Sequence, residues 1–339
     1  MRVLSSLASA LLVLSSSGCA DDDPMPPAAT WRESFPAEDL GWLLSVAGPS
    51  PEQLYAVGGA PGAGVARAWD GAAWGEVDLP PGTPLLNWVH AFASDDVYAV
   101  GEGGTILHYD GLTWSTETTT ATEDLWGVWG ASPDDVWAVG GRGFAEGQAT
   151  LLRRQEGRWT VQTLPPIVRA GVFALFKVWG SGPSDVFVVG QRGIILRFDG
   201  TTWREEGAGV SQDLIAVWGT SSSEVVAVGG RGNGVVVVWD GQAWTDYDDL
   251  APLPGLNGVW TGSEGEAWVV GEAGTVATFN TRTGAITQVE LPLTGAQGTY
   301  DFHAVFGDMS GRMTAVGGNF FMTAGPYRGL AYSLEPDTP

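Results

Sequence analysis

One segment of the sequence, residues 125–140 (LWGVWGASPDDVWAVG), recurs in degenerate copies along most of the chain. Its apolar residues alternate with small or polar ones around a Ser-Pro-Asp-Asp turn, which predicts two β-strands joined by a loop. A glycine-rich turn follows, then an apolar strand ending in Asp-Gly, then a Trp-bearing strand. Asp-Gly suits a tight hairpin because such a turn needs positive φ. Each copy therefore predicts four antiparallel strands.

A glycine closes the second strand of every copy, and the spacing of these glycines gives the architecture. The seven positions are Gly58, Gly101, Gly140, Gly190, Gly229, Gly271 and Gly317. They lie 43, 39, 50, 39, 42 and 46 residues apart, which is the period of a four-stranded propeller blade. A helical solenoid has a similar period, but no segment has the 3.6-residue periodicity of a helix pair. The sequence predicts an all-β, seven-bladed β-propeller with four antiparallel strands per blade.

The two ends of the chain indicate how the ring closes. The last copy ends at residues 329–339 (GLAYSLEPDTP), and no Trp-bearing strand follows. The missing strand is found at the other end, where residues 29–34 (ATWRES) resemble residues 201–206 (TTWREE). We expect the N-terminal strand to complete the last blade, which leaves no unpaired edge in the core.

Ten of the seventeen tryptophans fall at two repeated positions. The outer-strand position is held by Trp31, Trp74, Trp114, Trp159, Trp203 and Trp244, with Ile286 in the remaining copy. The inner-strand position is held by Trp129, Trp179, Trp218 and Trp260, with Ala47, Phe92 and Phe306 in the other copies. Rings at fixed blade positions predict packing between neighbouring sheets rather than ligand stacking.

The first 28 residues precede the repeats. Residues 1–18 combine Arg2, an apolar run and small residues, and they resemble a bacterial lipoprotein signal peptide, with Cys19 as the lipid-attachment residue. A plain secretory signal is the alternative. Residues 19–28 form an acidic, proline-rich tether, and residues 29–339 form a single propeller domain. We expect an extracytoplasmic, membrane-anchored monomer, with the outer membrane preferred over the inner one.

Composition narrows the classes of partner and of chemistry. The net charge of −23 argues against nucleic acid and against direct adhesion to anionic lipid. The single cysteine allows neither a disulfide nor a thiolate metal site, and three histidines without metal-ligand spacing predict no histidine metal site. The sequence has no GxSxG motif and no P-loop. We expect no metal and no cofactor, and a binding protein rather than an enzyme.

Loops emerge on two faces of a propeller, and the sequence treats the two faces differently. The face with the loops between the first and second strands carries the carboxylates Asp95, Asp96, Asp134, Asp135, Asp185 and Glu224. We expect these carboxylates to accept hydrogen bonds from turn amides rather than to bind calcium. The opposite face carries the insertions, which is typical of a binding face on a rigid scaffold.

The candidate binding face carries two sets of residues. Three consecutive copies place an arginine two residues after the closing glycine, namely Arg142, Arg192 and Arg231. These arginines either form a cationic arc that grips carboxylates or simply fill turns. A long insertion near the C-terminus supplies Phe320, Phe321, Met322 and Tyr327, which either fold over the channel mouth or are offered to a partner.

The motifs LxxVWG, DDVWAVG, GGTILHYDG and TW together resemble the repeats of the photosystem II assembly-factor-like propellers and, more loosely, of the Asp-box (BNR-like) propellers. The resemblance covers residues 29–334 and implies a seven-bladed propeller that binds protein. We therefore expect a lipid-anchored protein-interaction scaffold acting in the assembly of the cell envelope. The alternative is a carbohydrate-binding or glycan-cleaving, sialidase-like propeller, and a quinone-dependent dehydrogenase ranks third.

Overall fold

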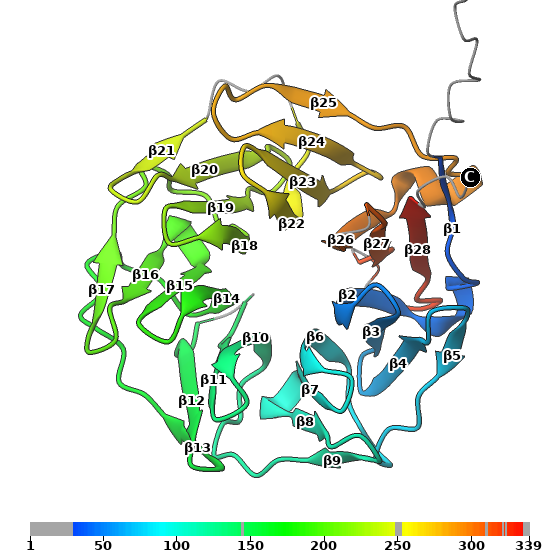
Figure 1. Cartoon of the computed structure of the whole chain (residues 1–339), viewed down its shortest axis with the longest axis horizontal. Coiled ribbons are helices and arrows are strands. Elements are labelled where there is room, and N and C mark those ends of the chain that lie inside the picture. The colour runs from blue at the N-terminus through cyan, green and yellow to red at the C-terminus, as the bar shows by residue number, and fades with distance from the viewer. Residues whose placement is uncertain are drawn as a thin grey trace, which may run out of the picture.

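A computed structural model describes residues 30–143, 146–247, 253–308, 311–320, 322 and 324–334. Seven four-stranded sheets stand like blades around a central axis (Figure 1). Every strand pair within a sheet is antiparallel, which confirms the predicted seven-bladed propeller. The expected signal peptide, Cys19 and the tether lie outside the described residues. Among the helices that are described, none has the length and apolarity to cross a membrane.

The strands of each blade follow one another from the axis outward. The blades are, in order, β2 (Trp42–Ser50), β3 (Gln53–Ala60), β4 (Ala63–Trp69), β5 (Trp74–Glu76); β6 (Leu86–Ala93), β7 (Asp96–Gly101), β8 (Ile106–Tyr109), β9 (Trp114–Thr116); β10 (Leu125–Ser132), β11 (Asp135–Gly140), β12 (Thr150–Gln155), β13 (Arg158–Val161); β14 (Leu175–Gly182), β15 (Asp185–Gly190), β16 (Ile195–Phe198), β17 (Trp203–Glu206); β18 (Leu214–Ser221), β19 (Glu224–Gly229), β20 (Val235–Trp239), β21 (Trp244–Asp246); β22 (Leu256–Ser263), β23 (Glu266–Gly271), β24 (Val276–Asn280), β25 (Ile286–Gln288); and β26 (Asp301–Gly307), β27 (Met313–Gly318), β28 (Gly329–Leu334), β1 (Trp31–Glu33). Four short 3-10 helices lie in the loops at Glu38–Leu40, Glu102–Gly104, Gln191–Gly193 and Gly295–Thr299.

The N-terminal strand closes the ring as predicted. β1 is the outermost strand of the seventh blade and pairs antiparallel with β28, so that Trp31 faces Leu334 and Glu33 faces Tyr332. Figure 1 shows the blue β1 beside the red β28. The first and last described strands therefore share one sheet, and β28 has no exposed edge along this stretch.

The closing glycines have a steric cause. A Cβ placed on any of the seven would lie 1.9–2.5 Å from a backbone carbonyl oxygen just before or at the start of the innermost strand. At Gly140 the clashing atom is the carbonyl oxygen of Asp124, at 2.0 Å. No side chain fits there, because a heavy-atom contact below 3 Å is strongly repulsive. The glycines that recur in the sequence thus lie where the second strand of each blade passes the residue that leads into the first strand.

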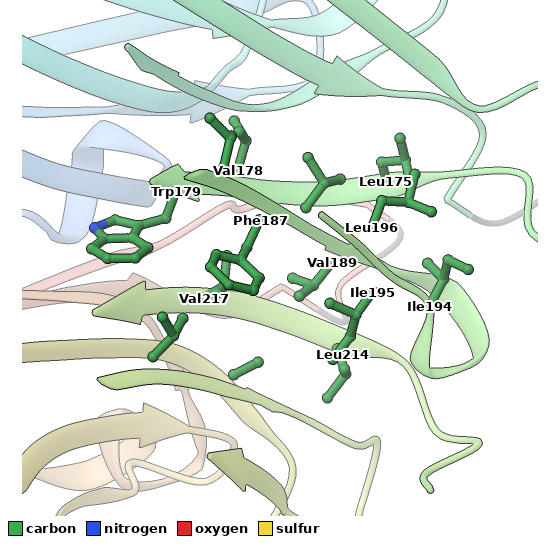
Figure 2. Packing of buried hydrophobic residues seen from close by; sticks show 14 of the residues in the cluster. Leu175, Val178, Trp179, Phe187, Val189, Ile194, Ile195, Leu196, Leu214 and Val217 are labelled. Atoms are coloured by element: carbon green, nitrogen blue, oxygen red, sulfur yellow. The ribbon is translucent and has the colours of Figure 1, made fainter. Parts of the chain in front are cut away.

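The outer tryptophans pack between blades as predicted. Each of five rings meets the second-strand ring of the preceding blade, with ring centroids 5.1–6.2 Å apart. The five contacts join Trp31 to Trp268, Trp114 to Tyr55, Trp159 to Tyr98, Trp203 to Trp137 and Trp244 to Phe187. Aliphatic side chains fill the rest of each interface, as Figure 2 shows for Val189 and Ile195 facing Leu214. This apolar contact holds the ring together.

The inner rings pack against glycines of the next blade, with one departure from the prediction. A Cβ on Gly180 would lie 2.6 Å from the Trp129 ring, and one on Gly219 would lie 2.6 Å from the Trp179 ring. In the second blade the pairing register puts His90, not Phe92, at the position of these tryptophans. A bulge between residues 91 and 93 shifts the alternation, and it still lets the Phe92 ring reach Gly130.

The carboxylates on the first face have two different partners. In the Asp-Gly turns one oxygen of the aspartate accepts hydrogen bonds from the amides two and three residues ahead, as at Asp70 and Asp110, and these bonds lower the pKa of both carboxyls. At the start of the second strands the partners differ: Glu224 accepts from the amide of Gly265 at 2.7 Å, as expected, but two of the aspartates do not have amide partners. Asp135 instead binds Arg153 through two bonds of 2.7 and 2.9 Å, and Asp185 binds Arg197.

Candidate functional site

A β-bulge in each innermost strand turns one side chain toward the axis. In all seven strands the pairing register skips the residue immediately after a fully buried Leu or Phe. The skipped residues are Leu44, Asn87, Trp126, Phe176, Ile215, Asn257 and His303. All seven line one pocket of about 510 Å³ at the axial mouth. Because a bulge leaves its extra residue out of the ladder, this side chain can leave the blade interface and point into the channel.

The pocket lies at the candidate binding face, and most of its wall is apolar. Trp126, Phe176 and Ile215 form one side, where the two aromatic rings meet edge to face at 6.4 Å. Trp42 and Phe320 form the other side, with ring centroids 5.8 Å apart. Below the pocket, inner-strand rings such as Trp129, Trp218 and Phe306 leave a space of only about 20 Å³ along the axis. An apolar cavity of this size with a few polar groups is typical of a ligand site.

The only lysine of the sequence, Lys177, lies in this pocket and is 3% exposed. Its Nζ donates a 2.7 Å hydrogen bond to the carbonyl oxygen of Trp126 and lies 4.2 Å from the centroid of the Trp88 ring. Burial lowers the pKa of Lys177 to about 7. Among the described residues no carboxylate lies within 4.0 Å of Nζ. An ammonium has three N–H groups, so two donors remain for another molecule.

Two further polar side chains offer acceptors beside Lys177. The Asn87 amide donates to the carbonyl of Leu125 at 2.9 Å, while its buried Oδ1 has no partner. The Nδ1 atom of His303 donates to the carbonyl of Leu44 at 2.6 Å, since a carbonyl oxygen can only accept. Burial, with the nearby charge of Lys177, lowers the pKa of His303 to about 3. The imidazole is therefore neutral near pH 7, with Nε2 unprotonated.

Three carboxylates surround the mouth and also fasten neighbouring blades. Glu102 Oε2 accepts from the amide of Gly62, and Asp124 Oδ1 accepts from that of Gly103, both at 2.9 Å. Asp301 accepts at 2.9 Å from the amide of Ala273, a residue in the left-handed region. Burial, together with the charge of Glu272, raises the pKa of Asp301 to about 6. The mouth is thus acidic while the floor carries an ammonium.

The three arginines predicted as an arc lie on this face, and each already has a partner. Arg142 Nε donates to Glu123 at 2.9 Å, and Arg231 Nε donates to Asp213 at 3.2 Å. Arg192 Nε donates to the carbonyl of Gly171 at 3.2 Å, and its backbone adopts positive φ. Arg192 and Arg231 line a second hollow of about 620 Å³. Arg231 also lines the axial pocket, so the two hollows adjoin.

The described residues of the aromatic insertion lie at and beside the channel mouth. Phe320 meets His303 edge to face at 5.2 Å and lines the axial pocket. The Tyr327 ring packs edge-on against Trp42 at 4.8 Å, outside that pocket. Phe321 lies outside the described residues. Of the two alternatives, the fold over the mouth describes Phe320, whereas Tyr327 packs beside the mouth against Trp42.

Sequence reasoning missed the axial pocket because it took the inner strands as regular. In a regular strand the residue after a buried Leu would lie against the neighbouring blade. One signal in the sequence could have revealed the bulge. The anchoring position at the start of the inner strand is Leu in six copies, whereas the position directly after it varies in size and polarity. Within the described residues, no cluster of His, Cys, Asp or Glu could hold a metal ion.

This fold and its axial mouth define a seven-bladed β-propeller with a hollow at one end. The WD40 β-propeller domain of Doa1 superposes with a TM-score of 0.69 at 10% identity, over 91% of this chain and 98% of that chain. YCF48 from Cyanidioschyzon merolae gives 0.66 at 13% identity, over 91% and 100%. YCF48 bound to D1 peptide gives 0.62 at 15% identity, over 91% and 97%. Neither the protein-family models nor the curated protein sequences give a match.

Proposed function

We propose that this chain is an interaction scaffold that binds a segment of a protein partner across the axial-mouth face. The observation that carries the proposal is the junction of two hollows at Arg231, one apolar around the axis and one polar beside Arg192. Together they would accept neighbouring apolar and polar side chains of one extended segment. YCF48, which has this fold, is known bound to D1 peptide.

The cellular setting is part of the same proposal. The signal-like residues 1–18 and Cys19 support a lipid anchor outside the cytoplasm, and the short tether would keep the propeller near the membrane. The anchor and the mouth suggest a role in assembling envelope proteins. Radiolabelled palmitate tests the anchor. Label in the wild-type chain and none in Cys19→Ala supports it, and equal label in both rejects it.

Crosslinking of the membrane-bound protein, followed by mass spectrometry, tests the binding face. A variant with Arg142, Arg192 and Arg231 changed to Glu should lose the captured partner. The matched control changes Arg158, Arg204 and Arg282 to Glu, which alters the net charge equally at exposed sites away from the mouth. Loss in the first variant alone supports the proposed face. Equal capture by both variants contradicts it.

The second candidate function is carbohydrate binding. The partly buried indole rings of Trp42 and Trp126 line the mouth together with the carboxylates of Glu102 and Asp124. Aromatic faces beside hydrogen-bonding carboxylates suit sugar rings. A glycan array tests this function. Binding that is lost in Trp126→Ala, while protein capture by crosslinking fails, would favour it over the protein scaffold.

A further inference from the structure

The axial pocket holds a buried ammonium without a counter-ion, and this points to a ligand. Lys177 donates one N–H to the Trp126 carbonyl, and its Nζ lies over the ring of Trp88. A buried charge is costly unless it is paired and hydrogen-bonded. At the corresponding position the other six blades carry Ser45, Trp88, Gly127, Ala216, Gly258 and Ala304, so the fold itself does not need a cation there.

A second buried polar atom lies in the same pocket. Asn87 is 1% exposed, and its Oδ1 accepts no hydrogen bond. The unprotonated Nε2 of His303 is a further acceptor. The floor thus combines free donors on Lys177 with acceptors on Asn87 and His303, and it lies beneath walls made by Trp126, Phe176 and Phe320. Such a floor fits a compact polar head, and such walls fit an apolar body.

We propose that the axial pocket binds a small monocarboxylic acid with a flat or aliphatic apolar body, whose carboxylate pairs with Lys177. The body lies between the Trp126–Phe176 side and the Trp42–Phe320 side. This small-molecule site goes beyond the protein binding proposed above and does not depend on it, and the acid would compete with the partner for the axial pocket.

The acidic mouth selects among anions. Glu102, Asp124 and Asp301 line the same pocket nearer the face. A monoanion can place its single charge on Lys177, whereas a phosphate monoester carries a larger charge past these carboxylates. A neutral ester or amide has no charge to pair with the ammonium and forms a weaker hydrogen bond. The expected order of affinity is therefore carboxylate, then methyl ester, then phosphate monoester.

Calorimetric titration of the full chain at pH 6.5 tests the site with three probes that share one body. The probes are 3-phenylpropionate, its methyl ester and 2-phenylethyl phosphate. The wild type should bind the carboxylate about tenfold or more tightly than the ester, because a charge-assisted hydrogen bond is the stronger one. In Lys177→Met, which keeps the length and apolar stem of the side chain, the two affinities should become equal. Octanoate and its methyl ester repeat the comparison with an aliphatic body.

A second variant guards against a folding defect in the first. Ile215→Trp places a larger side chain in the pocket wall and reduces the space for a ligand. It should lower the affinity for every probe by about tenfold or more while leaving Lys177 in place. Melting curves identify variants that have lost the fold. Three results would overturn the proposal: no carboxylate binding by the wild type at millimolar concentration, equal binding of carboxylate and ester, or a carboxylate preference that persists in Lys177→Met.

Discussion

Trp31 in β1 lies directly opposite Leu334 in β28, so residues from the two ends of the described chain are neighbours in one sheet. The Trp31 ring also meets Trp268 of the preceding blade at 6.0 Å. The short strand β1 thus joins the ring both by backbone pairing and by ring packing.

A chain that begins at residue 35 should therefore melt at a much lower temperature than one that begins at residue 30. Its loss of β1 removes the Trp31 ring from the core and uncovers the edge of β28. Calorimetry measures the shift, and light scattering should detect aggregation of the shorter chain. Equal melting temperatures would contradict closure by the N-terminal strand.

The closing glycines should not tolerate even a methyl group. Gly140→Ala places a Cβ 2.0 Å from the Asp124 carbonyl oxygen, so we expect a loss of about 1–3 kcal/mol in the free energy of unfolding. Gly207→Ala is the matched control, because a Cβ there meets no atom within 4 Å and the backbone does not have positive φ. Urea denaturation compares the two. Losses of equal size would show that the steric account is wrong.

The pair of Asp135 and Arg153 should stabilise its blade more than a surface ion pair does. Their side chains are only 15% and 18% exposed, and the guanidinium also lies 4.5 Å from the centroid of the Trp137 ring. A double-mutant cycle of Asp135→Asn and Arg153→Met should give a coupling of about 1–3 kcal/mol. The exposed pair of Glu264 and Arg282 should give about 0.5 kcal/mol or less. Similar couplings would count against the bidentate pair.

The free energy of unfolding should rise as the pH increases above 7, because the buried Lys177 then loses its proton in the folded chain. Its pKa is about 7 in the folded chain and near 10.5 when unfolded, so the unfolded state binds more protons across this window. The gain between pH 7 and pH 9 should be on the order of 2 kcal/mol. Lys177→Met should lose this dependence.

The comparison with Lys177→Met isolates one group among several that share the pocket. Besides Lys177, these ionisable groups are Glu102, Asp124, Arg231, Asp301 and His303. They are present in both proteins, so their own titration largely cancels. Guanidinium denaturation at several pH values measures the difference, and parallel curves for the two proteins would argue against a lowered pKa at Lys177.

The sequence predicted the blades well because local chemistry and tertiary contacts agree there. Gly140 is forced by a steric contact, Trp203 by an inter-blade interface and Asp110 by the amides of its own turn. Each cause recurs in most blades, so the repeat made it visible. Ring closure could be predicted for the same reason, since Trp31 stands where the outer-strand position was otherwise missing.

The binding face was predicted less well because its features depend on departures from the repeat. The bulges before Trp88 and Gly127 arise from how inner strands pair, and alternation alone does not reveal them. The partners of Arg142 and Arg231 are Glu123 and Asp213, which precede the inner strand of the same blade, so the pairing becomes visible only once the first two strands of that blade are paired. Phe320 was identified by its apolar character, but only the fold shows that it meets His303.

At each of the seven bulges, the residue that anchors the blade and the residue that lines the axial pocket are neighbours in the sequence. At each one, a buried Leu or Phe anchors the blade, and the next residue faces the axis without a place in the hydrogen-bonded ladder. Exchanging Ile215 for another residue type, for example, would change the chemistry of the mouth with little effect on the pairing of β18 and β19. One scaffold can thus acquire new specificity through the apolar positions among the seven, whereas Asn87, Asn257 and His303 also donate hydrogen bonds to backbone carbonyls of the next blade and contribute to holding the ring together.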